Sequence, residues 1–311
     1  MRETDALRPA PTAADRGEAP AEAPAEGLAE GLAEAGRRVA EQRMYRALVD
    51  RATAMARGPA APDAWAESIQ KLQASWQILK DKYGHEERPE PTPQADGGSW
   101  RGKGGRTLDA ARNAEIELGY ARIREVGESV IAPAILRVAA EDPTRALAGF
   151  DRRIKGADRL KEKITDRMRS KGRSATEALA QISDVVRFTF TYRESAYADG
   201  VRKDLGRLEA AGFTQIERRN TWASGQYKGI NTQWLEPRSG VRFEMQFHTQ
   251  ASLEAKELTH EAYERIRTVT ESTPAAERET AELTQFQHMV SSNIPMPPGV
   301  SDIDDYPPGG H

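Results

Sequence analysis

Residues 241–248, VRFEMQFH, alternate strictly between apolar and polar side chains. Because successive side chains of an extended strand point to opposite faces, this pattern predicts a β-strand with one buried face and one polar face. The polar face would carry Arg242, Glu244, Gln246 and His248. A solvated surface is the simpler explanation of that face, and the lining of a catalytic cleft is the alternative. Either way, the chain requires a sheet that is covered on at least one side.

The segments around this strand predict the rest of a domain over 149–292. Helices are predicted over 157–170, 196–211, 252–267 and 275–292. Strands are predicted within 183–192 and over 213–219, 228–235 and 241–248, the last two joined by a hairpin turn at 236–240. This order predicts an α+β fold with a mixed sheet of four to five strands flanked by helices.

The chain before residue 149 is predicted to be a disordered arm followed by a helical region. Residues 1–36 are rich in Ala, Pro and Glu, a composition that cannot bury a core. The remaining predictions are a helical hairpin over 37–84, a linker over 85–106, a helical lead-in over 107–148 that is broken near Pro133, and a Pro-rich tail over 293–311.

The two tryptophans of the predicted hairpin, Trp65 and Trp76, allow two interpretations. They would anchor an immunity or delivery protein that binds the helical N-terminal region, or they would form a small helical core. The helical core is the favoured interpretation.

Composition excludes several classes of protein. The chain has no cysteine, which rules out disulfide scaffolds and thiolate chemistry, and its formal net charge of −3 predicts no general attraction to nucleic acid or membrane. Sequence-specific nucleic-acid binding is not expected. The sequence has neither an apolar leader nor an apolar run long enough to cross a membrane, so a cytoplasmic site of action is expected. Leaderless secretion is compatible with the same sequence.

Two carboxylates stand out as candidate metal ligands. Asp184 opens the β-rich run 183–192, and Glu244 lies on the polar face of 241–248. An Asp at this place often only caps a turn. The alternative is that both carboxylates meet on adjacent strands, which would suit Mg²⁺ bridging the phosphates of a substrate.

Positive charge and a loop aromatic complete the candidate site. Residues 149–173 hold ten Lys or Arg against four Asp or Glu, in a chain that is otherwise acidic. A solvated helix face is the usual explanation, and a triphosphate clamp is the alternative. The loop GQYKGIN at 225–231 displays Tyr227, whose ring could stack on a purine base.

In this order, the motifs resemble the synthetase domain of the RelA/SpoT homologue family, the stringent-response alarmone synthetases. The resemblance covers about 149–267 and is closest to the toxin-like and actinobacterial ATP nucleotide 3′-pyrophosphokinase branch. It rests on Arg159-Leu160-Lys161, Asp184, Tyr227-Lys228-Gly229, and the E-x-Q-x-x-T motif of Glu244, Gln246 and Thr249.

The resemblance implies a nucleotidyltransferase-like synthetase fold and a Mg²⁺-dependent transfer of pyrophosphate from ATP to the ribose 3′-hydroxyl of a purine nucleotide. Asp184 and Glu244 would hold Mg²⁺, and Glu244 would help deprotonate the hydroxyl. The residues implied to bind ATP are Arg159, Lys161, Lys163 and Arg187. The residues implied to bind the acceptor are Tyr227, Lys228, Asn231, Gln246 and His248.

Three departures from the family pattern leave the acceptor open. The family has His where Asn231 stands, Arg where His248 stands, and a small residue where Arg187 stands. Guanine nucleotides, adenine nucleotides and the 3′ end of tRNA are all retained as acceptors, the last of these as the substrate of a toxin. The alternative to an enzyme is a nucleotide-sensing module without catalytic activity. No His-Asp pair of the family's hydrolase domain is found upstream, so the resemblance is to a synthetase alone.

Overall fold

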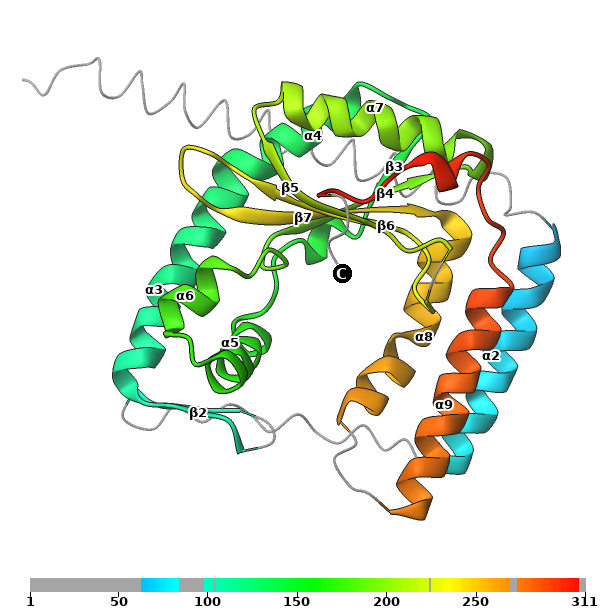
Figure 1. The fold of residues 1–311 in the computed structure, drawn as a ribbon, viewed down its shortest axis with the longest axis horizontal. Coiled ribbons are helices and arrows are strands. Elements are labelled where there is room, and N and C mark those ends of the chain that lie inside the picture. Colours follow the sequence, from blue (N-terminus) through cyan, green and yellow to red (C-terminus); the bar gives the residue numbers. More distant parts are fainter. Residues whose placement is uncertain (1–62, 84–97, 103–104, 224, 269–272, 308–311) are drawn as a thin grey trace, which may run out of the picture. The chain divides into compact units, whose positions relative to one another are not determined.

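A five-stranded mixed sheet organises the computed structural model, which describes residues 63–83, 98–102, 105–223, 225–268 and 273–307 (Figure 1). The strand order is β3-β4-β7-β6-β5; β4 and β7 are parallel, and the other neighbours are antiparallel. The strands are β3 (Ala146–Ala148), β4 (Arg187–Tyr192), β5 (Thr214–Asn220), β6 (Ile230–Leu235) and β7 (Arg242–Thr249). The predicted α+β class with a mixed sheet is confirmed.

The two faces of β7 separate as its alternation predicts. Phe243, Met245 and Phe247 are fully buried in the main core. Each such side chain contributes roughly 1.5–3 kcal/mol through burial. Figure 1 shows helices α4 (Ala132–Ala140) and α7 (Tyr197–Ala210) over this face of the sheet. Helices α5 (Ala157–Lys171) and α8 (Gln250–Thr268) lie on the other, polar side.

The helical lead-in is continuous but irregular. Helix α3 (Ala110–Val126) runs into a π-helical segment at Gly127–Ile131 and then into α4. The predicted break at Pro133 is therefore wrong: the helix continues through this residue, and the irregularity is the π-helical segment before it. Pro133 itself lies in the first turn of α4, a position that tolerates proline. The short strand β3 and helix α6 (Ala175–Ala180) were not predicted.

A buried ion pair ties β3 to α7 behind the sheet. Asp204, which is fully buried, accepts hydrogen bonds from the Arg145 guanidinium and from Tyr192 Oη. Arg145 also donates to the carbonyls of Val138 and Ala139 at the end of α4. Every charge in this group has partners, as a buried ion pair requires.

Helix α2 (Asp63–Tyr83) packs against α8 and α9 (Pro274–Ser292). Trp76 stacks on Phe286 with ring centroids 5.2 Å apart, and Trp65 donates from Nε1 to Glu254 of α8 at 2.8 Å. Both tryptophans are buried, which favours the helical-core interpretation over the interface anchors. The predicted pairing of this helix with 37–57 lies outside the described residues.

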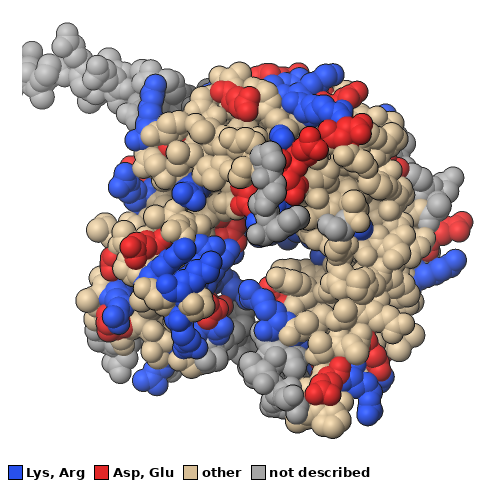
Figure 2. Space-filling model, viewed as in Figure 1, with Lys and Arg blue, Asp and Glu red and all other residues tan. Residues whose placement is uncertain are grey.

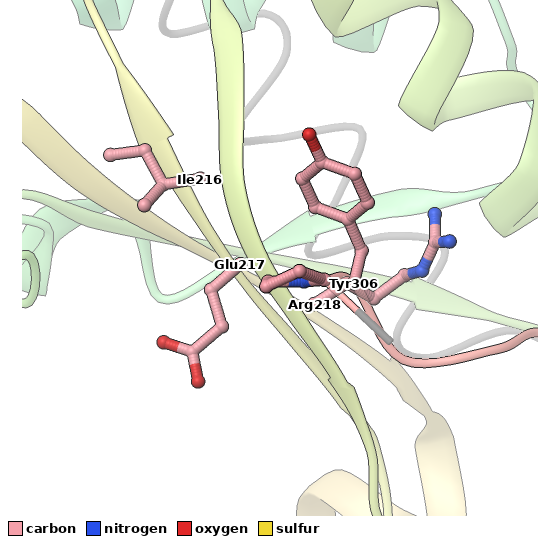
Figure 3. Close-up of a pocket in the computed structure, with 5 residues that line it drawn as sticks. Ile216, Glu217, Arg218 and Tyr306 are labelled. Atoms are coloured by element: carbon pink, nitrogen blue, oxygen red, sulfur yellow. The ribbon is translucent and has the colours of Figure 1, made fainter. Parts of the chain in front are cut away.

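Two segments outside the predicted domain also belong to the folded unit. Strand β1 (Trp100–Arg101) lies in the predicted linker and pairs with β2 (Thr107–Leu108), which lies at the start of the predicted helical lead-in. Trp100 is buried because it packs against α5. The segment 299–307 contains a helical turn at Val300–Asp302 and pairs through Tyr306 with Arg218 of β5. Figure 3 shows the pocket at this edge of the sheet, lined by Ile216, Glu217, Arg218, Tyr306 and Pro307.

None of the helices within the described residues combines the length and the apolar character needed to span a bilayer.

Candidate active site

The polar side of the sheet faces a hollow between α5 and α8. Figure 2 shows the surface hollowed there, with Lys and Arg side chains gathered over α5. The strand register brings Arg187 of β4 beside Glu244 of β7, and Gln233 of β6 beside the same glutamate. Two residues further along β7, Gln246 lies beside Thr189 of β4 and Asn231 of β6. A row of polar side chains therefore lines the floor of the hollow.

Asp184 lies in the turn just before β4. The backbone beside it pairs with the segment before α5, because Lys155 N donates to Val185 O and Arg187 N donates to Arg153 O. This pairing holds Lys155 Nζ 2.7 Å from Asp184 Oδ2, and Lys163 of α5 reaches Oδ1 at 2.8 Å. Burial alone would raise the pKa of Asp184, but the charges and hydrogen bonds of the two lysines outweigh it and lower the pKa to about 2.

Glu244 lies next to the same turn. Its backbone N–H donates to Val186 O at 2.9 Å, and its carboxylate accepts a hydrogen bond from Gln246 Nε2 at 2.8 Å. Burial, followed by the negative charge of Asp184, raises the pKa of Glu244, and nearby Lys256, Arg187 and Lys163 offset only part of the rise. Glu244 therefore lies on the polar side of the sheet, beside the turn that carries Asp184.

Only some of the basic side chains of α5 face Asp184 and Glu244. Arg159 and Lys163 are four residues apart and share a helix face. Lys161 lies about 200° around the helix from Lys163, at 3.6 residues per turn. It is nearly buried, pairs with Glu117 of α3 and lies 6.0 Å from the Trp100 ring. The assignment of Lys161 to ATP is therefore corrected: it joins α5 to α3.

The hollow has three further basic side chains, those of Arg159, Arg187 and Lys256. Arg159 Nη1 lies 3.3 Å from Glu264 of α8, so an ion pair joins α5 to α8. Arg187 is exposed at the start of β4. Lys256 of α8 donates to Gln246 Oε1 at 2.6 Å; burial and the charge of Arg187 lower the pKa of Lys256 to about 8. Lys155 and Lys256 were not assigned to the site from the sequence.

Tyr227 is held by hydrogen bonds from its hydroxyl group. The hydroxyl donates to Asn231 Oδ1 at 2.7 Å and lies 2.7 Å from His248 Nε2, whose ring is perpendicular to that of the tyrosine. Burial, followed by the charge of Lys256, lowers the pKa of His248 well below its usual value. The imidazole is therefore neutral, and its Nδ1 lies 2.8 Å from Ser252 Oγ.

This arrangement separates the residues that were assigned to the acceptor. Tyr227, Asn231 and His248 come together, and Gln246 lies beside them on the sheet. Lys228 instead donates to the carbonyl of Trp222 in its own loop at 2.9 Å, so its charge is directed away from them.

The carboxylates suit magnesium in chemical character. Within the described residues no three His, Cys, Asp or Glu side chains form a metal-binding group. Mg²⁺ does not need one, since it is commonly held by one or two carboxylates together with substrate phosphates and water. Asp184 is ionised at neutral pH and Glu244 lies beside it, so this pair fits such a site.

No protein-family model matches the sequence, and no curated protein shows significant similarity to it.

The solved structures that resemble this chain include a type VI effector, a small alarmone synthetase and a GTP pyrophosphokinase family protein. The type VI effector Tas1, in complex with its immunity protein, is 16% identical over 58% of this chain and 97% of its own, with a TM-score of 0.38. Small alarmone synthetase 1 from Bacillus subtilis, bound to its product pppGpp, is 18% identical over 58% and 91%, with a TM-score of 0.39. A GTP pyrophosphokinase family protein from Streptococcus pneumoniae is 12% identical over 60% and 91%, with a TM-score of 0.38.

Proposed function

We propose that this protein transfers the β,γ-pyrophosphate of ATP to the ribose 3′-hydroxyl of a purine nucleotide. The observation that carries the proposal is the convergence of Asp184 and Glu244 on one side of the sheet, with Lys155 and Lys163 bound directly to Asp184. Phosphoryl-type transfer depends on positioning and on neutralising charge, and this group of side chains is suited to both.

In this proposal the basic and the acidic residues of the site have different roles. Lys163, Lys155 and Arg187 bind the ATP phosphates, and Arg159 does so after exchanging its partner Glu264. Asp184 and Glu244 hold Mg²⁺, which when bound neutralises charge that develops on the phosphates. The lysines that pair with Asp184 are placed to turn towards phosphate when the nucleotide enters.

The transfer forms one bond to the β-phosphorus and breaks another. The acceptor 3′-oxygen forms a bond to the β-phosphorus, and the bond from that phosphorus to the α,β-bridging oxygen breaks. The bonding electrons leave with AMP, and Glu244 accepts the proton of the hydroxyl. We place this reaction in the cytoplasm, where ATP and nucleotide acceptors are available.

Tyr227 is proposed to stack on the acceptor base. Replacing it with Ala should raise the KM for the acceptor by roughly 10–100-fold, since base–aromatic stacking contributes about 1–3 kcal/mol, and should leave the KM for ATP near the wild-type value. Steady-state kinetics with each substrate varied in turn measures both constants. Tyr227→Phe keeps the ring and serves as the matched variant. An acceptor KM that Tyr227→Ala leaves unchanged would remove the residue from the acceptor site.

The acceptor itself is to be found by experiment. The protein is incubated with ATP, Mg²⁺ and one of GDP, GTP, AMP, ADP or tRNA, and with ATP alone, and the products are separated by chromatography and identified by mass. We expect AMP together with an acceptor that has gained a 3′-pyrophosphate. Product on tRNA alone would identify a tRNA-modifying toxin. ATP binding in calorimetry without AMP release from any mixture would instead support a nucleotide-sensing module.

A further inference from the structure

Lys256 belongs to α8, the wall opposite α5, and the start of this helix is fixed to the end of β7. Thr249 N–H donates to Ser252 Oγ at 3.0 Å, and Ser252 N–H donates back to Thr249 Oγ1 at 3.1 Å. The outer side of α8 is packed against α2 and α9 through Ala251, Ala255 and Ala262. Lys256 therefore projects from a firmly anchored helix towards the polar side of β7.

A chain of two hydrogen bonds leads from Lys256 to Glu244. Lys256 Nζ donates to Gln246 Oε1 at 2.6 Å, and Gln246 Nε2 donates to Glu244 Oε2 at 2.8 Å. Gln246 is buried, and the side chains of Glu244 and Lys256 are half-buried. The amide thus bridges a cation and a carboxylate that do not hydrogen-bond to each other directly.

The charge of Lys256 fixes which way this amide points. An ammonium group only donates hydrogen bonds, so it must face the amide oxygen. A carboxylate only accepts, so it must face the amide NH₂ group. Without the lysine, the amide could rotate and present its oxygen to Glu244, which would repel the carboxylate and release it from its present rotamer. The lysine therefore selects one of two amide orientations.

We propose that Lys256 is a positioning residue that acts through Gln246 to hold the Glu244 carboxylate in its working orientation. With Oε2 bound by the amide, the rest of the carboxylate is left for the reacting hydroxyl and for Mg²⁺. This role rests on the proposed pyrophosphate transfer and adds to it a residue that neither the motifs nor the basic run indicates. It differs from a phosphate contact, because its effect must pass through Gln246.

The kinetic test compares Lys256→Met, Lys256→Arg, Gln246→Met and the double variant Lys256→Met/Gln246→Met. Lys256→Met should lower kcat by roughly 10–100-fold, the size of a lost hydrogen bond to a charged group, while the KM for ATP stays near the wild-type value. Lys256→Arg should recover most of the activity, because a guanidinium also only donates. In the Gln246→Met background, loss of the lysine should cause little further decrease.

Lys203→Met is the matched control, since Lys203 is exposed on α7 on the other side of the sheet. It should leave both constants unchanged, and thermal unfolding checks that all variants fold. Equal losses from Lys256→Met in both backgrounds would overturn the proposal. So would a raised KM for ATP at unchanged kcat, which would make Lys256 a phosphate-binding residue.

A second readout does not depend on activity. In ¹⁵N-edited NMR spectra, the Nε2 proton signals of Gln246, assigned by their absence from Gln246→Met, should be displaced from the range of free glutamine. They should move towards that range in Lys256→Met and not in Lys256→Arg. Signals that Lys256→Met leaves in place would contradict the proposal. If wild-type protein releases no AMP with any acceptor, the proposed function fails, and the NMR comparison still decides the orientation of the amide.

Discussion

Glu244→Gln should lower kcat for pyrophosphate transfer by roughly 10²–10⁴-fold, the range expected for loss of a general base. The variant also loses a ligand to Mg²⁺, which makes the larger values the expected ones. The substitution keeps the size of the side chain, and its amide oxygen can still accept the hydrogen bond from Gln246 Nε2. Folding should therefore be preserved. Single-turnover AMP formation, with thermal unfolding alongside, provides the measurement.

Glu209→Gln is the matched control for this prediction. Glu209 is exposed on α7, behind the sheet, so the same loss of charge occurs away from the hollow. Its activity should equal that of the wild type. Activity in Glu244→Gln within a few-fold of the control would show that Glu244 is not the base, and the mechanism proposed here would need another one.

Asp184→Asn should impair both activity and stability, with a dependence on pH that identifies the cause. The folded-state pKa of about 2 lies below the ordinary value of 3.8, so the ionised carboxylate stabilises the folded protein at pH values above 3.8. A shift of this size corresponds to about 2 kcal/mol. This contribution should be lost as the pH falls from about 4 to about 2, where the carboxylate becomes protonated in the folded protein as well.

Denaturant unfolding of wild type and Asp184→Asn between pH 7 and pH 2 measures that contribution. The difference in unfolding free energy should be present at pH 7 and should shrink below pH 4. Asp199→Asn, on the exposed surface of α7, controls for loss of a carboxylate. A difference that persists unchanged to pH 2 would attribute the effect to packing instead of to the pairs with Lys155 and Lys163. In the transfer assay, Asp184→Asn should also lose most activity, because one ligand to Mg²⁺ is removed.

The strands of the sheet could be predicted where side-chain alternation was strong. The predicted strand at 241–248 became β7 at Arg242–Thr249, and the predicted helix at 157–170 became α5 at Ala157–Lys171. β3 could not be predicted, because its three residues, Ala146, Leu147 and Ala148, are too few to show a periodicity and form a strand only through pairing with β4. Helix α6 did carry a local signal, the capping box of Ser174 and Glu177, which the prediction overlooked.

The candidate site was only partly accessible from the sequence. Asp184 is an even number of residues from the buried Val186 and Phe188, so a regular strand would turn its side chain into the core. It reaches the polar side because it lies in the turn before β4 and not within the strand. Lys155 and Lys256 could not be singled out, because contacts between separate elements of the fold bring them to Asp184 and Gln246. Lys161 could have been excluded, since helical spacing places it on a different face from Lys163.

Pyrophosphate transfer by this protein can be tested by following the β-phosphorus of ATP. ATP labelled at that position is incubated with Mg²⁺, the protein and the acceptor found in the product assay. We expect the label to pass into the acceptor as part of a 3′-pyrophosphate, while the AMP that is released is unlabelled. Label that remains in ADP, or that never leaves ATP in the presence of any acceptor, would contradict this expectation.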